Sequence, residues 1–357
     1  MTLKQWWHDA TATISEQARL QAQERQNQLT KPQGSLGRLE EVAINLAAMQ
    51  NQTKPQINSP YMIVFAADHG IVAQGVSAFP QSVTIAMLAN FVDGGAAVAT
   101  LCQQQNIKLS VINCGTASAC EHLLGVIHKP IMAGTQDFSQ QAAMSAEQVQ
   151  LALAIGKEQA EQAHAQGCDF MMLGEMGIGY TSSASCIGAL LLDEKVENLT
   201  GAGTGMFGED LIHKKNILAA CVERVRGQYQ APLSSIPLKV LEQVGGLEIA
   251  AITGAYIRAA QLGIPCLVDG FITTAAALLA VKINPEVRAW LLFSHHSIEY
   301  GHTELLAALE AKPLLSLDMR LGEGSGAAVA FSTVQQALTI HNNMATFAEA
   351  AVENKSS

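Results

Sequence analysis

The chain has 357 residues, of which 49% are hydrophobic and only 5% aromatic, and its formal net charge at pH 7 is −10. That length permits one large domain or two, with a sizeable buried core. The acidic balance argues against a nucleic-acid-binding surface, because neutralising phosphates requires clustered lysine and arginine, and only His213-Lys214-Lys215 forms a short basic cluster. The composition favours helices packed closely on a sheet through small residues.

Targeting signals and metal-ligand spacings are missing from the sequence. Residues 1–20 lack a basic region followed by an apolar one, so we expect no secretory signal. The sequence has no run of 18 or more apolar residues, so we expect no membrane span. The seven cysteines are scattered and form no C-x-x-C pair, so we expect buried, reduced thiols in a cytoplasmic protein and no metal site.

The two ends of the chain are predicted to be helical. Residues 1–29 carry apolar side chains at helical spacing, residues 31–38 interrupt the helix with a proline and two glycines, and a second helix is expected over 39–49. A helix over 327–351 could fold back beside these two. We therefore expect two domains, a small helical one from residues 1–60 and 330–357 and a large α/β one over 61–329.

Between these ends, short apolar runs alternate with alanine-rich segments. The runs are predicted strands, at 61–67, 109–115, 170–177, 265–271 and 290–296. The alanine-rich segments are predicted helices, at 82–105, 145–166, 181–192, 237–262 and 272–282. This alternation predicts an α/β fold with a mostly parallel sheet flanked by helices. Ligands of such sheets bind beyond the carboxyl ends of the strands, where the polar residues of these runs stand.

Glycine-rich turns follow several of these strands. Gly174–Ser183 joins a strand to a helix, and its backbone N–H groups at a helix N-terminus could hold a phosphate. Gly201–Gly205 is a second such turn, with Lys214 nearby, and Val268–Phe271 is a third. None is a Walker motif, because no Gly-Lys-Ser/Thr follows, and a single turn of this kind is more often structural. Several of them at strand ends indicate a phosphorylated small molecule as ligand.

A fourth turn, Arg320–Ala328, holds a single carboxylate, Glu323, among glycines. Glycine allows positive φ angles and a close approach of substrate to the backbone. The apolar run 327–331 predicts that a buried helix follows. Glu323 is therefore either an acid placed at a helix N-terminus, where the helix dipole favours it, or a catalytic carboxylate.

Two other kinds of site are alternatives. Aspartate and histidine side chains at strand ends could form a metal site: Asp68, His69, His295, His296 and His302. Neither H-E-x-x-H nor H-x-H spacing supports it. A Ser-His-Asp hydrolase could use Ser297, His302 and Asp269, but the G-x-S-x-G elbow of such enzymes is missing.

Eight segments carry a resemblance to a known family: Lys31–Leu39, Ala67–Gly70, Gly75–Pro80, Gly174–Gly179, Val244–Gly246, Asp269–Phe271, Ser294–Ser297 and Arg320–Ala328. They run in family order across nearly the whole chain. On these segments the chain resembles the nicotinate-nucleotide–dimethylbenzimidazole phosphoribosyltransferases, which make the lower-ligand nucleotide of cobalamin. The resemblance implies a Rossmann-like sheet with a small helical domain, a homodimer, and no metal or organic cofactor.

The same resemblance implies a reaction. Nicotinate mononucleotide donates its 5-phosphoribosyl group to a ring nitrogen of 5,6-dimethylbenzimidazole, giving nicotinate and α-ribazole 5′-phosphate. The cationic pyridinium leaves without needing an acid, whereas the acceptor must lose a proton from its other ring nitrogen. Glu323 matches the family's general base. Glu175 matches a second acid near the ribose, which could stabilise the oxocarbenium-like C1′.

The resemblance also implies binding residues. Lys214 would pair with the phosphate, helped by the backbone near Gly177 and Gly179. The predicted phosphate- and nucleotide-binding set is Lys214, Gly177, Gly179, Gly203, Asp269, Gly270 and Ser297.

Some positions depart from the family pattern. Tyr180-Thr-Ser stands where relatives often have Asn-Thr-Thr. Phe79 and Met87, with Leu321, would make the acceptor pocket apolar, although core packing explains Phe79 and Met87 as well. An apolar pocket suits a flat ring but specifies few hydrogen bonds, so other benzimidazoles, purines or phenols stay open as acceptors. A non-catalytic nucleotide-binding relative is the alternative from another class.

Overall fold

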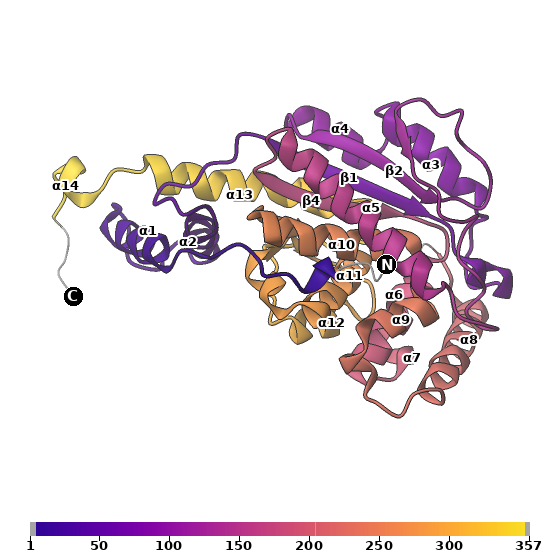
Figure 1. Ribbon diagram of the computed structural model, residues 1–357. Helices are drawn as coiled ribbons and strands as arrows, with labels where there is room; N and C mark the ends of the chain where they lie inside the picture. Colours follow the sequence, from indigo (N-terminus) through magenta and orange to yellow (C-terminus); the bar gives the residue numbers. More distant parts are fainter. Residues whose placement is uncertain (1–4, 204, 354–357) are drawn as a thin grey trace.

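The computed structural model describes residues 5–203 and 205–353, and its centre is a six-stranded parallel sheet in the order β3-β2-β1-β4-β5-β6 (Figure 1). The strands are β1 (Pro60–Ala67), β2 (Lys108–Gly115), β3 (Val126–His128), β4 (Phe170–Met176), β5 (Cys266–Val268) and β6 (Leu291–Phe293). A separate parallel pair joins β7 (His295–His296) to β8 (Leu315–Ser316). The predicted fold class, a Rossmann-like α/β fold, is confirmed.

The strand order reverses between β1 and β4, the two strands at the centre of the sheet. Phe65 of β1 lies opposite Ile112 of β2 on one side and Glu175 of β4 on the other. Both central strands are buried along their whole length, as their continuous apolar sequences require. In open α/β sheets the ligand crevice forms at this reversal, beyond the carboxyl ends of the strands. The topology therefore places Glu175 beside that crevice.

Helices cover both faces of the sheet (Figure 1). One face carries α5 (Ala146–Ala165), α10 (Leu247–Leu262) and α11 (Phe271–Ile283). The other carries α3 (Ser82–Val92), α4 (Ala97–Gln104) and α13 (Ser325–Asn343). Helices α5 and α10 pack with their backbones in close approach, because a Cβ atom on Gly156 would collide with the carbonyl of Ala251, and one on Gly254 with that of Leu153. Small residues thus allow the close helix packing that the composition predicts.

The remaining helical elements lie in the connections and at the ends of the chain. The α-helices are α1 (Glu16–Gln28), α2 (Arg38–Gln50), α6 (Tyr180–Leu192), α7 (Val196–Leu199), α8 (Gly208–Arg226), α9 (Pro237–Val244), α12 (His302–Ala308) and α14 (Phe347–Ala350). The 3-10 helices are η1 (Trp6–His8), η2 (Gly70–Gln74), η3 (Leu233–Ser235) and η4 (Pro285–Trp290).

Several predicted boundaries are wrong for local reasons. The single helix expected over 82–105 is split into α3 and α4 by Asp93-Gly94-Gly95, and that expected over 237–262 is split at Gly245-Gly246 into α9 and α10. Glycine in a helix interior is entropically costly, so both breaks coincide with glycine pairs. The helix expected over 1–29 begins only at Glu16, with residues 1–4 outside the described part.

The remaining differences concern element ends and missed elements. The helix expected over 327–351 divides into α13 and α14, and the strands expected over 265–271 and 290–296 contribute only three residues each to the main sheet. Helices α8 and α12 and the edge strand β3 lie where no element is expected.

One described segment, Ser82–Gln104, is long and apolar enough to cross a membrane by length and composition, with a mean hydropathy of 1.6 and a third of the window buried. The sequence criterion of an uninterrupted apolar run misses it. The chain divides this segment into α3 and α4. The 11 residues of α3 make a rod of about 16 Å, against about 30 Å for a hydrocarbon core. Neither helix alone has the length of a span.

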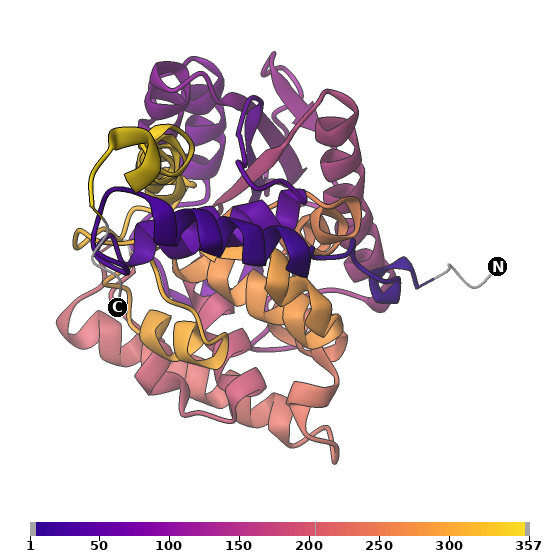
Figure 2. The same cartoon turned by 90° about the vertical axis from the view of Figure 1, so that its left-hand side faces the viewer.

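Helices α1 and α2 lie across one end of the molecule, beside the C-terminal half of α13 (Figure 2). Arg25 of α1 donates hydrogen bonds to the backbone carbonyls of His341 and Asn342, and Leu29 forms an isolated bridge with Thr346. The two chain ends therefore pack together. Because α13 runs without a break through residue 330, the division into two domains stays a proposal.

Candidate active site

The Glu323 turn sits directly on the central sheet. Gly322, Glu323 and Gly324 have φ angles of 82°, 65° and 83°, three consecutive left-handed residues, and α13 follows at once. A Cβ atom on Gly174 of β4 would lie 2.5 Å from the backbone oxygen of Glu323. Gly174 must therefore be a glycine because a side chain would collide with the turn. Gly322 and Gly324 suit the turn because L-residues other than glycine seldom adopt positive φ. The prediction that a buried helix follows the turn is confirmed.

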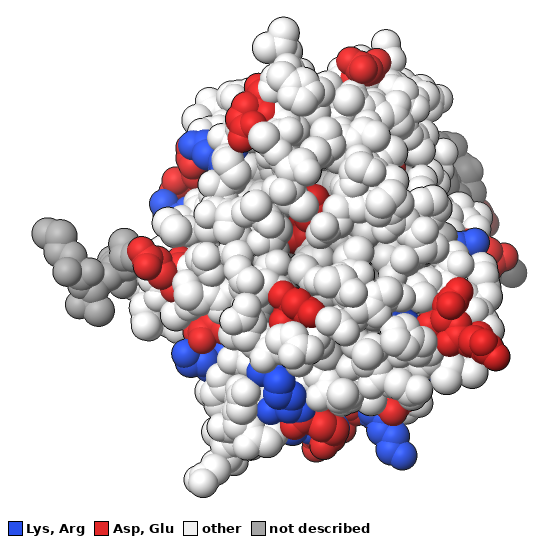
Figure 3. Space-filling model, turned by 90° about the vertical axis from the view of Figure 1, so that its right-hand side faces the viewer, with Lys and Arg blue, Asp and Glu red and all other residues white. Residues whose placement is uncertain are grey.

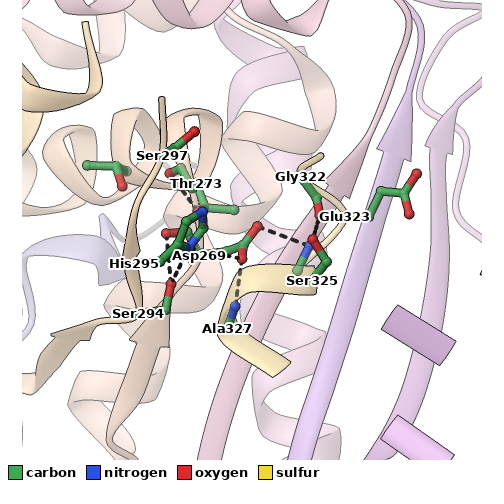
Figure 4. A network of polar contacts seen from close by, with 12 residues as sticks. Asp269, Thr273, Ser294, His295, Ser297, Gly322, Glu323, Ser325 and Ala327 are labelled. Carbon is green, nitrogen blue, oxygen red and sulfur yellow. Dashed lines mark hydrogen bonds and ion pairs between the residues drawn. The ribbon is translucent and has the colours of Figure 1, made fainter. Parts of the chain in front are cut away.

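Asp269 holds this turn in place from the end of β5 (Figure 4). Its Oδ1 accepts a hydrogen bond from the N–H of Ala327 at 2.7 Å, and its Oδ2 accepts one from Gly324 at 3.1 Å. These are free amides of the first turn of α13, which a carboxylate satisfies well. Asp269 is only 1% exposed. Both of its oxygens thus serve the Glu323 turn, whereas the sequence places Asp269 on the nucleotide side.

Two further carboxyl groups lie at this turn. Glu175 is 1% exposed; its Oε1 accepts the N–H of Glu323 at 3.2 Å, and its Oε2 has no partner among the described residues. Burial, and then the charge of Asp269, raises the pKa of Glu175 well above its ordinary range. The same two causes raise the pKa of Glu323 to about 7. The side chain of Glu323 points away from the Asp269 contacts (Figure 4), so its carboxylate is not committed to them.

A cleft next to this turn collects residues from all four predicted glycine-rich turns. Its lining is Glu175, Tyr180, Thr181, Gly203, Gly270, Phe271, Ile272, His295, Ser297, Glu299, Arg320, Leu321 and Gly322. Five of the predicted site residues line it: Glu175, Gly203, Gly270, Ser297 and Leu321. The structure therefore brings together turns of which the first and the last are separated by roughly 150 residues in the sequence.

Lys214 of α8 does not itself line this cleft, but it lies next to two residues that do, Thr181 and Gly203. It is 2% exposed, and its Nζ donates a hydrogen bond to Oγ1 of Thr181 at 3.0 Å. A Cβ atom on Gly203 would lie 3.5 Å from the same Nζ. Burial lowers the pKa of Lys214 to about 8. Arg320 adds a second cation, whose Nη1 donates to the Gly203 carbonyl at 3.4 Å.

Packing alone requires the glycines of the β4–α6 turn. A Cβ atom on Gly177 would collide with the carbonyl oxygen of Ala67, and Gly179 has a φ of 103°. Between them, the N–H of Ile178 donates to Oγ1 of Thr84 at 3.2 Å. Phosphate binding by this turn stays a prediction.

The two alternative sites do not take shape. Nδ1 of His302 accepts the N–H of Ser297 at 2.9 Å, its Nε2 lies 3.0 Å from Oγ1 of Thr274, and burial lowers its pKa to about 3. His302 thus shapes the Ser297 backbone and makes no triad with Asp269. The metal alternative is divided between two places, because His69 pairs with Glu248 at 2.7 Å, away from the histidines after β6. Within the described ranges, no three histidine, cysteine or acidic side chains gather to hold a metal ion.

The three predicted acceptor residues do not gather in this cleft. Leu321 is 48% exposed and lines the cleft. Phe79 is 44% exposed, Met87 is half-buried on α3, and neither lines this cleft. Ala78, next to Phe79, would lie 4.0 Å from a Cβ atom on Gly205, so this segment approaches the second glycine turn. The acceptor pocket stays a prediction.

Sequence reasoning missed several residues of the cleft. Thr181 and Arg320 belong to two of the predicted glycine-rich turns, so these motifs could have identified them as site residues. Glu299 had no such signal, because only the fold carries the β7–α12 connection to this cleft.

Viewed toward the end at which the strands stop, the surface is largely uncharged (Figure 3). A few acidic groups lie in hollows near the centre of this face, and most lysine and arginine side chains lie toward its rim.

A parallel sheet whose strand order reverses beside a cleft with buried carboxyl groups is the arrangement of an α/β enzyme. A family model described as phosphoribosyltransferase matches residues 11–352. The nicotinate-nucleotide–dimethylbenzimidazole phosphoribosyltransferases of Ectopseudomonas mendocina and Pseudomonas aeruginosa are each 48% identical over 351 residues, which is 98% of this chain and 99% of theirs.

Two solved structures from Thermus thermophilus agree. One is described as nicotinate-nucleotide–dimethylbenzimidazole phosphoribosyltransferase, with a TM-score of 0.88 and 39% identity over 96% of this chain and 100% of that one. The other, described as CobT, has a TM-score of 0.89 and 40% identity over 94% and 99%. The chain belongs to the nicotinate-nucleotide–dimethylbenzimidazole phosphoribosyltransferase family, whose members are pentosyltransferases.

Proposed function

We propose that this protein transfers the 5-phosphoribosyl group of nicotinate mononucleotide to 5,6-dimethylbenzimidazole, giving α-ribazole 5′-phosphate and nicotinate for the nucleotide loop of cobalamin. The observation that carries the proposal is Glu323, a buried carboxyl with a pKa of about 7 beside the cleft at the reversal of the sheet. The names of the relatives support the choice of substrates.

The donor needs no acid, because its pyridinium leaves C1′ as a neutral ring. Positive charge develops at C1′ as that bond breaks, and Glu175 is the carboxyl that lines the cleft at the sheet end. Burial favours the neutral form of Glu175, whereas the cationic ring and the charge at C1′ both favour its ionised form. Binding of the donor would therefore ionise Glu175 where the charge is needed.

The acceptor does need a base. Its attacking nitrogen gains positive charge as the glycosidic bond forms, and removal of the proton from the other ring nitrogen cancels that charge. Glu323 would take this proton. A base with a pKa near the working pH combines a useful ionised fraction with adequate basicity. Its side chain points away from the Asp269 contacts that fix its backbone.

Lys214 would bind the donor phosphate, with Arg320 and the second glycine turn close to it. The phosphate would restore the protonated form of Lys214, which burial disfavours. Gly270 and Ser297, which line the cleft, would bind the nucleotide side, together with Gly177 and Gly179 of the β4–α6 turn.

The direct test is to incubate the purified protein with nicotinate mononucleotide and 5,6-dimethylbenzimidazole, measure released nicotinate, and identify the second product by mass. We expect equal amounts of nicotinate and α-ribazole 5′-phosphate. Release with another benzimidazole, a purine or a phenol alone would move the proposal to a different acceptor. No release with any of these rings would contradict the enzymatic function.

We also propose that the protein is a cytoplasmic homodimer. The apolar helices α3 and α4 support the dimer, because only a third of the apolar window they span is buried within one chain. The seven buried, unpaired cysteines fit a reducing compartment. Light scattering after size exclusion should give twice the chain mass; a monomer at micromolar concentration would contradict the dimer.

A further inference from the structure

Thr84 of α3 is fully buried and connects two parts of the site. Its Oγ1 accepts the N–H of Ile178, in the turn after β4, at 3.2 Å and lies 2.6 Å from Oδ1 of Asp68. The amide of Ile178 can only donate, so the single proton of the Thr84 hydroxyl is directed at Asp68. The chemistry of the three groups therefore fixes the direction of both hydrogen bonds.

Asp68 is itself held firmly at the end of β1. Its Oδ2 accepts the N–H of Ala117 at 2.8 Å, its backbone N–H donates to Gly115 at 3.0 Å, and its carbonyl accepts from Thr135 at 2.9 Å. Burial raises the pKa of Asp68, while the bonds from Ala117 and Thr84 oppose that rise. The carboxyl group is therefore an immobile acceptor for Thr84.

The two ends of this connection belong to opposite sides of the proposed reaction. Ile178 lies between Gly177 and Gly179 in the turn assigned to the donor. Met87, assigned to the acceptor, lies three residues after Thr84 on α3, one helical turn away. We propose that Thr84 is a positioning residue: its hydroxyl holds the donor turn at a fixed place relative to the acceptor helix. This inference rests on the proposed function for the roles of the two sides.

Removing the hydroxyl would leave two buried groups without their partner, the N–H of Ile178 and Oδ1 of Asp68. Both are then free to draw water or to shift the turn. Reacting atoms must approach within about 3–3.5 Å, and a misplacement of about 1 Å can cost about 100-fold in rate. Thr84 therefore acts through the turn and not by touching substrate.

The test compares Thr84→Val, which keeps the shape and removes the hydroxyl, with the matched control Thr84→Ser, which keeps the hydroxyl. We expect Thr84→Val to lower kcat/KM by about 10- to 100-fold, with KM raised for donor and acceptor alike. Thr84→Ser should stay within about 3-fold of the unchanged protein. Thr84→Ala gives the same comparison if the valine variant does not fold.

A purely structural role predicts a different result: Thr84→Val would melt at a lower temperature but keep its kcat/KM and both KM values when assayed well below that temperature. That result would overturn the proposal. So would an equal loss of kcat/KM in Thr84→Ser.

A second readout does not depend on activity. Hydrogen exchange of the backbone amides over residues 177–180 should be faster in Thr84→Val than in Thr84→Ser, because the Ile178 amide loses its acceptor. If the unchanged protein lacks transferase activity while this difference is found, the proposed function fails, and what stands is that Thr84 holds the turn after β4 against α3. Equal exchange rates in the two variants would show that Thr84 does not hold this turn, and would overturn the proposal.

Discussion

Two groups of buried ionisable side chains, acidic and basic, lie in or next to the cleft. At the sheet end, Glu175, Asp269 and Glu323 lie together, and burial raises the pKa of all three. At the other end, Lys214 is buried against Thr181, and burial lowers its pKa to about 8. At each end, burial therefore disfavours the ionised form, and an oppositely charged ligand would relieve that cost.

This difference matches the charges of the proposed donor. Nicotinate mononucleotide carries a positively charged ring nitrogen, bonded to C1′, at one end of its ribose and an anionic phosphate at the other. A cation near Glu175 would favour its ionised form, and a phosphate near Lys214 would favour the ammonium form. The site is thus electrostatically complementary to the proposed donor, and Glu323 is available to act on the acceptor.

The largest expected effect comes from the acid end. Glu323→Gln removes the base and keeps the shape, so kcat/KM for dimethylbenzimidazole should fall by about 10²- to 10⁴-fold. The binding of nicotinate mononucleotide, measured by calorimetry, should change little, because the base acts on the acceptor.

A matched acceptor sharpens this result. A benzimidazole methylated on one ring nitrogen has no proton to lose at that position, so the slow rate it supports should be the same for Glu323→Gln and the unchanged protein. An equally large loss with the methylated ring would assign Glu323 to binding instead of proton removal.

The sequence predicted the local backbone geometry of the acid end better than its long-range contacts. The glycine neighbours of Glu323 predicted the positive φ angles and the helix that follows, because those properties are local. The role of Asp269 could not be predicted in this way: its partners Gly324 and Ala327 are more than 50 residues away in sequence. Alternation of strands and helices predicted the sheet, whereas the breaks at Gly94-Gly95 and Gly245-Gly246 show how easily adjoining helices merge in a pattern.

The lysine end should respond more weakly and in a different parameter. Lys214→Met keeps an apolar stem in a buried place and removes the charge. A charge-assisted hydrogen bond contributes about 1.5–3 kcal/mol, so KM for nicotinate mononucleotide should rise by about 10- to 100-fold. Initial rates over a range of donor concentrations measure it. A fall in kcat with unchanged KM would separate Lys214 from the phosphate.

A smaller effect concerns stability. The pKa of Glu323 is about 7 in the folded protein against an ordinary value of 4.5, so the folded state binds this proton more tightly than the unfolded state. Its stabilising contribution is complete below pH 4.5 and is lost as pH rises through 7. Glu323→Gln should therefore be more stable at pH 8, by up to about 3 kcal/mol, and similar to the unchanged protein near pH 4.

Urea unfolding at the two pH values measures this difference. Equal free energies of unfolding for Glu323→Gln and the unchanged protein at pH 8 would show that the fold does not disfavour the ionised form of Glu323.

The pH dependence of kcat/KM for the unchanged protein and Glu323→Gln tests the central claim most directly. For the unchanged protein we predict a bell-shaped profile, rising through about pH 7 as Glu323 ionises and falling above about pH 8 as Lys214 loses its proton. In Glu323→Gln the rise at about pH 7 should vanish and the fall above about pH 8 should remain. A substrate phosphate, with a second pKa of about 6, titrates equally in both proteins. An unchanged rise at about pH 7 in Glu323→Gln would contradict the assignment of Glu323 as the base.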